Sequence, residues 1–282
     1  MNILIADSGS TKTQWALVSA DGGCVARTTG GINPVHTPVG EVEALLQSEF
    51  AAERGRVDAV RFYGAGCLPS TCGAMTGVLS RFFGTDDVTV ESDLLGALRG
   101  VLGDRPGVGC ILGTGSNSAL YDGRQVVKHI PPLGYLLGDE GSGADLGRRL
   151  IGNLLKGLLP EELTAAFWQT YPLGYEEIIE AVYRKPGANR FLAQFAPFLC
   201  KYIDHPAARS IVDEAFVAFV ERNLLAYDGI RQLPVSFTGS IAFYFETSLR
   251  RVLERYGLAL GTVEQSPLPG LIQYHTNKII TP

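Results

Sequence analysis

One pattern occurs twice in this chain and restricts its fold more than any other feature: an apolar run, a short polar turn and a second run. The first copy spans 3–18, and its turn carries Asp7. The second copy spans 109–121, with its turn at 113–117. Each copy predicts two antiparallel strands that hold a polar loop between them. One copy at the start of each half predicts a duplicated α/β architecture, with the two loops facing each other across a cleft.

The two turns differ in the chemistry that they offer. The first, at 7–13, contains the small residues that an ordinary hairpin turn requires. Its amides and hydroxyls could equally bind an anion while its carboxylate holds a cation, which would suit a metal-bound polyphosphate. This turn alone leaves the two interpretations about even. The second turn, at 113–117, has no acidic residue and fits phosphate oxygens better than a metal.

The composition limits the number of domains and the partners. A chain of 282 residues has room for about two domains. A break rich in Gly and Pro at 103–107 predicts their boundary, giving domains at 1–106 and 107–282. The net charge is -5 and the basic residues form no run, which argues against nucleic acid and an anionic membrane as partners. No apolar run approaches the ~20 residues that span a bilayer, and no leader segment is evident, so we expect a cytoplasmic protein.

Cysteine and histidine give little sign of a metal site. The five cysteines are odd in number and form no C-x-x-C pair, which predicts reduced and mostly structural thiols. Cys67 and Cys72 could ligate a metal, but their spacing is loose and no histidine lies near them in the sequence. The four histidines form no cluster at ligand or catalytic spacing.

Asp93 ends a strand-like run at 88–93 and stands before a helical pattern at 94–102. Aspartate is a common helix N-cap, and for this residue alone capping is the favoured explanation. The alternative is a general base at the ligand edge of a sheet.

A segment rich in glycine follows the second turn. Five glycines between positions 134 and 147 accompany Asp139, Glu140 and Asp145, and a helical pattern begins after them. Carboxylates near the start of a helix often only balance its dipole. The glycines are harder to explain in this way and indicate that backbone approaches another group closely.

A third junction lies at 233–242, where a strand-like run passes through Gly239 and Ser240 into a helical pattern. Such a junction can seat the ribose or α-phosphate of a nucleotide, although a plain strand-to-helix turn explains it as well. The chain contains neither G-x-x-x-x-G-K-[ST] nor G-x-G-x-x-G, so neither a P-loop nor a dinucleotide-binding fold is supported.

The order of these motifs resembles that of a known family. The motifs are D-x-G-x-T-x-T at 7–13, Asp93 at the end of a strand, G-T-G-S at 113–116, G-D-E-G-S at 138–142 and F-T-G-S at 237–240. Together they resemble the N-acetylglucosamine kinase group of the BadF/BadG/BcrA/BcrD ATPase family, within the sugar kinase, actin and Hsp70-like ATPase superfamily. The resemblance extends from Ile3 to about Ile280.

The resemblance implies a fold, a reaction and a set of partners. The fold would be α/β, with two related ribonuclease H-like domains around a nucleotide-binding cleft. The reaction would transfer the γ-phosphate of ATP, with Mg²⁺, to a hydroxyl of an amino sugar. N-acetylglucosamine, phosphorylated at its 6-hydroxyl, is the first expectation, ahead of glucosamine and N-acetylmuramic acid. Homodimers are common among such relatives.

The resemblance also implies roles for individual residues. Asp7 would organise Mg²⁺, usually through water, and Asp93 would be the catalytic base. The first phosphate loop would consist of Gly9, Ser10, Thr11, Lys12 and Thr13, the second of Gly113, Thr114, Gly115 and Ser116, and the adenosine motif of Gly239 and Ser240. The residues expected to contact the sugar are Asn33, Asp93, Thr114 and Asp139.

Two other functions are known for related folds. ATPases that activate dehydratases or reductases through an iron–sulfur cluster carry a cysteine in the second phosphate loop, and 113–117 contains none. Sugar-responsive transcriptional repressors carry a DNA-binding segment before the first phosphate loop, which here begins seven residues from the start. A sugar kinase is the first expectation, and an iron–sulfur ATPase activator and a non-catalytic sugar-sensing regulator are the alternatives.

Overall fold

The computed structural model describes residues 1–9 and 11–280, without the side chains of 278–280. Its contacts divide the chain into two compact units. The first contains Met1–Arg105, Gly123–Gln125 and the segment from Ser266 onward, and the second contains Pro106–Asp122 and Val126–Gln265. The change at Arg105 lies one residue from the predicted boundary. The segment from Ser266 onward belongs to the first unit, whereas the prediction placed it in the second domain.

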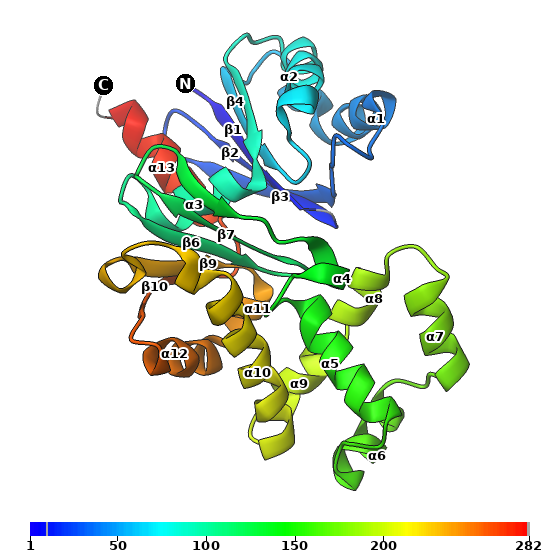
Figure 1. The fold of residues 1–282 in the computed structure, drawn as a ribbon. Coiled ribbons are helices and arrows are strands. Elements are labelled where there is room, and N and C mark those ends of the chain that lie inside the picture. Colours follow the sequence, from blue (N-terminus) through cyan, green and yellow to red (C-terminus); the bar gives the residue numbers. More distant parts are fainter. Residues whose placement is uncertain (10, 281–282) are drawn as a thin grey trace. The chain divides into compact units, whose positions relative to one another are not determined.

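The first unit contains a five-stranded sheet (Figure 1). Its order is β3 (Cys24–Gly30), β2 (Lys12–Val18), β1 (Ile3–Ser8), β4 (Ala59–Gly64) and β5 (Val88–Ser92). The strands β1, β2 and β3 are antiparallel, whereas β4 and β5 run parallel to β1. Ser8, Gly64 and Ser92 pair across the three parallel strands, so the loops that follow them leave the same edge of the sheet.

The second unit repeats this topology. Its order is β8 (Val126–Ile130), β7 (Ser116–Tyr121), β6 (Gly107–Leu112), β9 (Pro234–Thr238) and β10 (Ala259–Glu264). The strands β6, β7 and β8 are antiparallel, and β9 and β10 run parallel to β6. The duplicated α/β architecture predicted from the two turns is confirmed.

Four α-helices cover the first sheet. They are α1 (Val39–Phe50), α2 (Pro69–Phe83), α3 (Asp93–Leu102) and α13 (Leu268–Ile280), with a 3-10 helix at Ala51–Glu53. Leu4 and Ala6 of β1 pack in the core that includes α1 and α2, while Ile3 and Ile5 pack with Leu271 of α13. Because both faces of β1 are buried, its apolar residues follow one another without alternation.

The helix α13 closes against α3 and β4. A Cβ at Gly270 of α13 would collide with the backbone of Gly100 in α3, and a Cβ at Gly100 would collide with Pro267, the residue before α13, so the two segments touch at these glycines. Tyr63 Oη lies 2.8 Å from His275 Nε2 and accepts a hydrogen bond of 2.9 Å from Arg99. These contacts join the C-terminal helix to α3 and β4.

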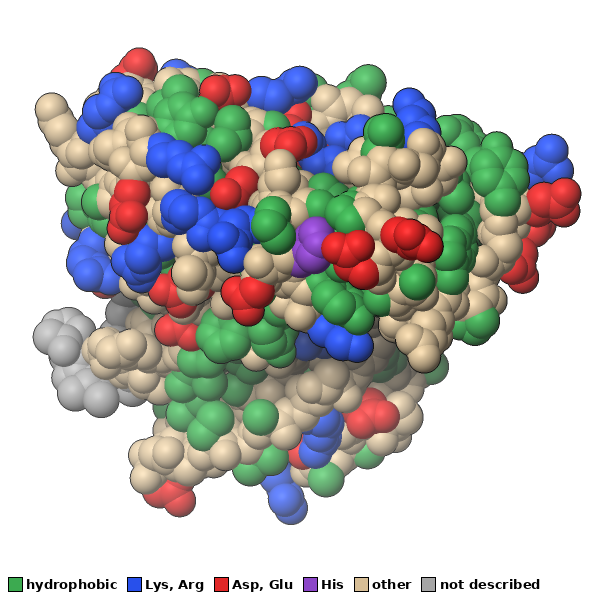
Figure 2. Space-filling view, turned by 90° about the horizontal axis from the view of Figure 1, so that it is seen from below, with side chains coloured by type: hydrophobic (Ala, Val, Ile, Leu, Met, Phe, Trp, Pro, Cys, Tyr) green, Lys and Arg blue, Asp and Glu red, His purple; other side chains and the backbone are tan. Residues whose placement is uncertain are grey.

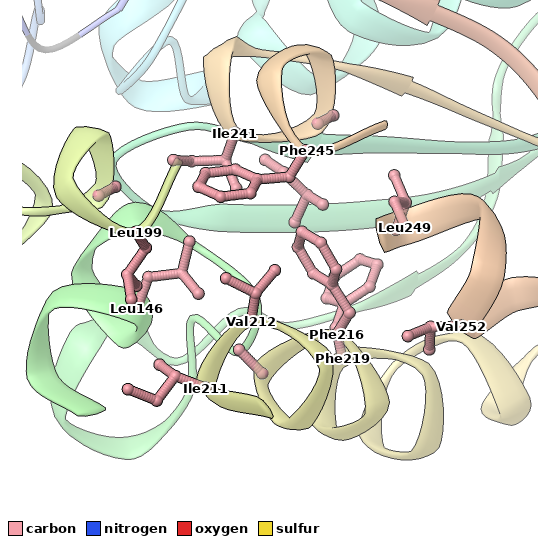
Figure 3. Packing of buried hydrophobic residues seen from close by; sticks show 14 of the residues in the cluster. Leu146, Leu199, Ile211, Val212, Phe216, Phe219, Ile241, Phe245, Leu249 and Val252 are labelled. Carbon is pink, nitrogen blue, oxygen red and sulfur yellow. The ribbon is translucent and has the colours of Figure 1, made fainter. Parts of the chain in front are cut away.

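The helices of the second unit bury a larger core. They are α4 (Gly134–Leu137), α5 (Gly143–Leu155), α6 (Glu161–Thr170), α7 (Tyr175–Tyr183), α8 (Ala188–Ala193), α9 (Ala196–Lys201), α10 (Pro206–Arg222), α11 (Ser240–Tyr244) and α12 (Glu246–Arg255), with 3-10 helices at Leu224–Ala226 and Ile230–Gln232. In Figure 3, Phe216 and Phe219 of α10 point toward Phe245 and Leu249. This core supports the face of the second sheet that carries Leu112.

Side chains of several kinds share one face of the molecule. Figure 2 shows basic, acidic and apolar side chains interspersed over one face. Among the helices that the structure describes, none combines the length and the apolar character needed to cross a bilayer. All five cysteines are free thiols.

Candidate active site

The first polar loop is held by two buried hydroxyl groups. Ser8 Oγ lies 2.7 Å from Thr13 Oγ1, and both accept the backbone amide of Ile32, at 3.0 and 3.2 Å. Thr13 Oγ1 also donates to the carbonyl of Gly30, at 3.0 Å. These bonds fasten the β1–β2 hairpin to the segment that follows β3. The side chain of Thr13 therefore stabilises the hairpin through these hydrogen bonds.

The remaining predicted residues of this loop face solvent. Gly9, Thr11 and Lys12 are exposed, and the amide of Gly9 donates to the carbonyl of Lys12 at 3.0 Å. The predicted phosphate contact at Ser10 lies outside the described residues.

Asp7 is the charged group at the base of this loop. It is partly buried at the end of β1, opposite Gln14 of β2. Its pKa is raised from 3.8 to about 7, first by burial and then by the negative charge of Asp93, while Lys12 acts in the opposite direction. The carboxylates of Asp7 and Asp93 therefore lie close enough to repel each other.

Asp93 does not cap the helix that it begins. The N-cap of α3 is Ser92, whose hydroxyl accepts the amide of Leu95 at 3.2 Å. One carboxylate oxygen of Asp93 accepts the amide of Leu94 at 2.8 Å. The capping explanation favoured for Asp93 is therefore wrong. Asp93 follows the carboxyl end of β5, at the sheet edge where Asp7 also lies.

Asn33 is fixed beside the same edge by the turn after β4. The Cα of Gly66 lies against the carboxamide of Asn33, where a Cβ would collide, and Gly66 has a φ of 79°. Asn33 Oδ1 accepts the amide of Val35 at 3.0 Å. The charge of Asp93 also acts on the buried thiol of Cys67, one residue beyond Gly66. The first unit thus brings Asp7, Asn33 and Asp93 to one edge.

Gly66→Ala should destabilise the protein by about 1–2 kcal/mol, because alanine tolerates a positive φ poorly and its methyl group would displace Asn33. Urea denaturation measures the change. Gly73→Ala is the matched control: Gly73 is exposed within α2 and has open space around its Cα. This control should gain roughly 0.5–1 kcal/mol of helix stability. Equal effects of the two substitutions would contradict the packing argument.

The second loop uses its carbonyls and part of its amides internally. The carbonyls of Gly113 and Thr114 accept the first two amides of α5, at 2.8 and 3.1 Å. The amide of Gly113 donates to the carbonyl of Gly115, and the amide of Ser116 donates to Asp139 Oδ1 at 3.1 Å. Within the described residues, the amides of Thr114 and Gly115 are the backbone donors of this loop for which no acceptor is present. Two of the four predicted residues thus present amides suited to phosphate oxygens.

Asp139 lies in the second unit, against this loop. It is 8% exposed, and burial is the main reason that its pKa is raised. The adjacent carboxylates are engaged elsewhere: Glu140 pairs with Arg222 at 2.6 Å, and Asp145 pairs with two arginines of α5. Asp145 also accepts the amide of Gly141 at 3.1 Å. The segment that carries Asp139 is therefore anchored on both sides.

The predicted adenosine motif, at Gly239 and Ser240, lies next to the second loop. Gly239 has a φ of 114°, and a Cβ there would collide with the carbonyl of Leu112 at the end of β6. Its amide donates to the carbonyl of Glu264 at 2.9 Å. Ser240 is exposed at the start of α11. The second unit thus brings 113–116, Asp139 and 239–240 together.

Several positions that shape the site have no signal in the sequence motifs. Ser8 and Ile32 hold the first loop, Gly66 orients Asn33, and the amides of Gly143 and Ala144 orient the second loop. Gly66 and Gly143 contact Asn33 and Gly113, which are about 30 positions away along the chain, so the sequence gives no sign of these contacts.

Asp7 is suited to a magnesium ion that is held mostly by water and phosphate. Within residues 1–9 and 11–280, no group of three or more His, Cys, Asp or Glu side chains could hold a metal ion. Mg²⁺ commonly keeps several waters and binds through one or two carboxylates together with substrate phosphates. The repulsion between the carboxylates of Asp7 and Asp93 is the setting that a divalent cation would relieve.

The known proteins that resemble this chain come from solved structures. No family model matches the chain, and no curated protein sequence matches it. A solved structure from Porphyromonas gingivalis, provisionally named an N-acetylglucosamine kinase, is 48% identical; the match covers 98% of this chain and 99% of that one, with a TM-score of 0.93. A second protein of that provisional name, from Chromobacterium violaceum, is 21% identical over 97% and 98% of the two chains, with a TM-score of 0.75.

A ROK family glucokinase from Streptomyces griseus, solved with glucose and AMPPNP, is 14% identical over 97% and 98% of the two chains, with a TM-score of 0.60. At their low identities, the Chromobacterium and Streptomyces proteins share the fold with this chain. The Porphyromonas protein is similar enough in sequence, over nearly the whole of both chains, to show the family. The chain therefore belongs to the N-acetylglucosamine kinase-like family of ATP-dependent carbohydrate kinases, with the actin-like ATPase fold.

Proposed function

We propose that this protein transfers the γ-phosphate of ATP to the 6-hydroxyl of N-acetylglucosamine. The observation that carries the proposal is the pair of Asp7 and Asp93, which share one sheet edge and lie close enough for the charge of Asp93 to raise the pKa of Asp7. Phosphoryl transfer needs little covalent chemistry from the protein and depends on positioning and charge stabilisation. One carboxylate for the metal side and one for the acceptor hydroxyl meet that need.

Asp93 is proposed as the general base. It would accept the proton of the attacking hydroxyl as the new oxygen–phosphorus bond forms and ADP leaves. Asn33, beside it, would hydrogen bond a neighbouring sugar hydroxyl. Thr114 is proposed to lie close to both the phosphate and the sugar.

The nucleotide is proposed to bind to the predicted phosphate loops and the predicted adenosine motif. The amides of Thr114 and Gly115 and the turn at 239–240 would hold phosphates and adenosine, and the first loop from Gly9 to Lys12 would contribute further amides and a positive charge. When bound, Mg²⁺ would neutralise charge on the phosphates, and Asp7 would orient its water ligands.

The protein is proposed to act as a homodimer, which light scattering of the purified protein would measure.

An ADP-release assay over amino sugars and plain hexoses tests the function. We expect the highest kcat/KM with N-acetylglucosamine, and a 6-phosphate product identified by phosphorus NMR. The control is the same assay without any sugar. It should release ADP at a small fraction of that rate, because transfer of the phosphate to water should be slow while the acceptor site is unoccupied. A protein that binds ATP and phosphorylates none of these sugars would not be the proposed kinase.

A further inference from the structure

We propose that Tyr63 is a positioning residue for Asp93: it supports α3 on the first sheet and so fixes the place of the carboxylate at the start of this helix. The proposal rests on the kinase function above, in which Asp93 is the general base. It gives the C-terminal helix a part in the chemical step, because α13 holds both Tyr63 and α3.

The helix α3 lies directly on the side chain of Tyr63. A Cβ at Gly96 would lie 2.7 and 2.8 Å from Cβ and Cγ of Tyr63, closer than such atoms approach. Gly96 does not have the positive φ that would otherwise favour glycine, and glycine weakens a helix interior relative to alanine. Glycine at 96 therefore serves this close approach. Asp93 stands three residues earlier on α3, so the contact lies within one turn of the proposed base.

The sheet holds Tyr63 in a fixed place. Tyr63 is 1% exposed, and its strand pairs with β1, where Asp7 is its partner, and with β5 on the other side. A strand paired on both sides cannot shift without breaking hydrogen bonds to its neighbours. The pairing of β4 and β5 ends one residue further, at Gly64 and Ser92, and Asp93 follows. Tyr63 is thus a fixed support beside the sheet edge that carries both aspartates.

The hydroxyl of Tyr63 joins α3 to α13. Arg99 Nη1, on α3, donates to Tyr63 Oη at 2.9 Å, and Nε2 of His275, on α13, lies 2.8 Å from the same oxygen. The guanidinium of Arg99 also lies 5.8 and 5.4 Å from the ring centroids of Tyr63 and Tyr274. Burial raises the pKa of Tyr63 above its ordinary value of 10.0, so at neutral pH the hydroxyl keeps its hydrogen and can donate it to His275.

The helix α13 holds α3 at the next turn. A Cβ at Gly100 would collide with Pro267, and a Cβ at Gly270 would collide with the backbone of Gly100. Figure 1 shows the two helices side by side. Gly100 lies about one turn beyond Gly96. Successive turns of α3 are therefore held, the first by Tyr63 and the second by the C-terminal segment.

The carboxylate of Asp93 is tied to this helix. Its Oδ1 accepts the amide of Leu94, the second residue of α3, at 2.8 Å. Because a helix of ten residues moves as one hydrogen-bonded unit, a shift at Gly96 or Arg99 reaches Asp93. A misplacement of roughly 1 Å can cost a reaction about 10²-fold in rate. The support under α3 should therefore affect the chemical step.

Tyr63→Phe keeps the ring under Gly96 and removes the hydroxyl. It should lower kcat about threefold to tenfold, with the affinity for AMPPNP changed less than about twofold, because the nucleotide contacts are proposed to lie elsewhere. Gly96→Ala places a methyl group against Tyr63 and should lower kcat further, by at least about tenfold. Single-turnover kinetics at saturating sugar and calorimetry of AMPPNP measure the two effects. Urea denaturation checks that both variants are folded under the assay conditions.

Phe83→Leu is the matched control for a loss of stability without displacement of α3. Phe83 packs in the core on the opposite face of the first sheet, where its ring centroid lies 6.0 Å from that of Phe50 and 4.9 Å from that of Phe82. The substitution removes buried apolar contacts and should lower stability, while kcat stays within about twofold of the wild type.

Double substitutions test whether Tyr63 acts through Asp93. If Tyr63 positions the base, Tyr63→Phe should cause little further loss of kcat in the Asp93→Asn background, where the base is already missing. The same result is expected for Gly96→Ala. A purely structural contribution would instead lower kcat by the same factor in both backgrounds.

The space beside His275 permits a further test. A cavity of about 570 Å³ is lined in part by Tyr63, Arg99 and His275, and it has room for imidazole. His275→Ala should lower kcat about as much as Tyr63→Phe does. Added imidazole should restore the kcat of His275→Ala, because it can bond to the Tyr63 hydroxyl in place of the missing ring, and it should leave Tyr63→Phe unchanged.

The outcomes separate this inference from the function on which it rests. Normal kcat in both Tyr63→Phe and Gly96→Ala overturns the positioning role and leaves the kinase function intact. Equal losses of kcat in the wild-type and Asp93→Asn backgrounds also overturn it. Near-normal kcat in Asp93→Asn alone overturns the role of Asp93 as the base, and this inference with it.

Discussion

Asp93→Asn should lower kcat for sugar phosphorylation by about 10²–10⁴-fold, the usual contribution of a positioned general base. Asparagine keeps the size and polarity of the side chain but cannot accept the proton of the hydroxyl. Affinity for AMPPNP should change less than about threefold, because the nucleotide contacts are proposed to lie elsewhere. Single-turnover kinetics at saturating sugar, combined with calorimetry of AMPPNP, measure the two effects separately.

Ser92→Ala is the matched control for this substitution. It removes the N-cap of α3 without touching the proposed base, and should cost about 1 kcal/mol of stability. Its kcat should stay within a fewfold of the wild type. If Asp93→Asn retained near-normal kcat, or if Ser92→Ala lost as much activity, the proposed role of Asp93 would be wrong.

Asp7→Asn should abolish most Mg²⁺-dependent turnover and at the same time stabilise the metal-free protein at pH 8. The pKa of Asp7 is raised to about 7 in the folded state, against 3.8 as the ordinary value. Between these two values the folded protein holds a proton that the unfolded chain has lost, so the free energy of unfolding falls as the pH rises through this window. Above pH 7 the full cost of ionising Asp7 remains, and asparagine removes it.

The expected gain for Asp7→Asn at pH 8, without Mg²⁺, is about 1–3 kcal/mol, since each unit of pKa shift corresponds to about 1.4 kcal/mol and solvent access reduces the effect. The gain should shrink as the pH is lowered toward 4. Urea denaturation at several pH values measures it. Lys12→Met is a second test. It removes the positive charge that favours ionised Asp7, so it should lower the stability at pH 8. A variant Asp7→Asn that is less stable than the wild type at pH 8 would contradict the electrostatic explanation.

Local patterns predicted much of the fold because the elements next to the loops have strong periodicity. The strand-like run predicted at 88–93 extends one residue beyond β5, and the helical pattern that follows coincides with α3 apart from its first residue, Asp93. The choice of N-cap failed at this point, since Ser92 and Asp93 can both cap a helix. The decision depends on where β5 stops pairing with β4, at Ser92, and sheet register cannot be derived from one strand.

The internal supports of the candidate site could not be predicted in the same way. Asp139 and Ser116 are separated by 23 positions, and Ser8 and Ile32 by 24, so each contact exists only after the unit has folded. The sequence likewise does not show which sheet the helix α13 covers. Assigning that helix to the second domain followed the order of the chain, and burial of Leu268 and Leu271 with β1 decided otherwise.

The place of α13 in the first unit has a consequence for synthesis. Ribosomes release the chain from its N-terminus, so β1 emerges early, and the whole second unit follows before residues 268–280 appear. Until then, Ile3 and Ile5 lack the cover of Leu271, and Tyr63 lacks His275. Domains usually fold in the order in which they are made. Here the second unit, whose segments lie entirely between those of the first, can finish first, and the N-terminal unit would be the last to become native.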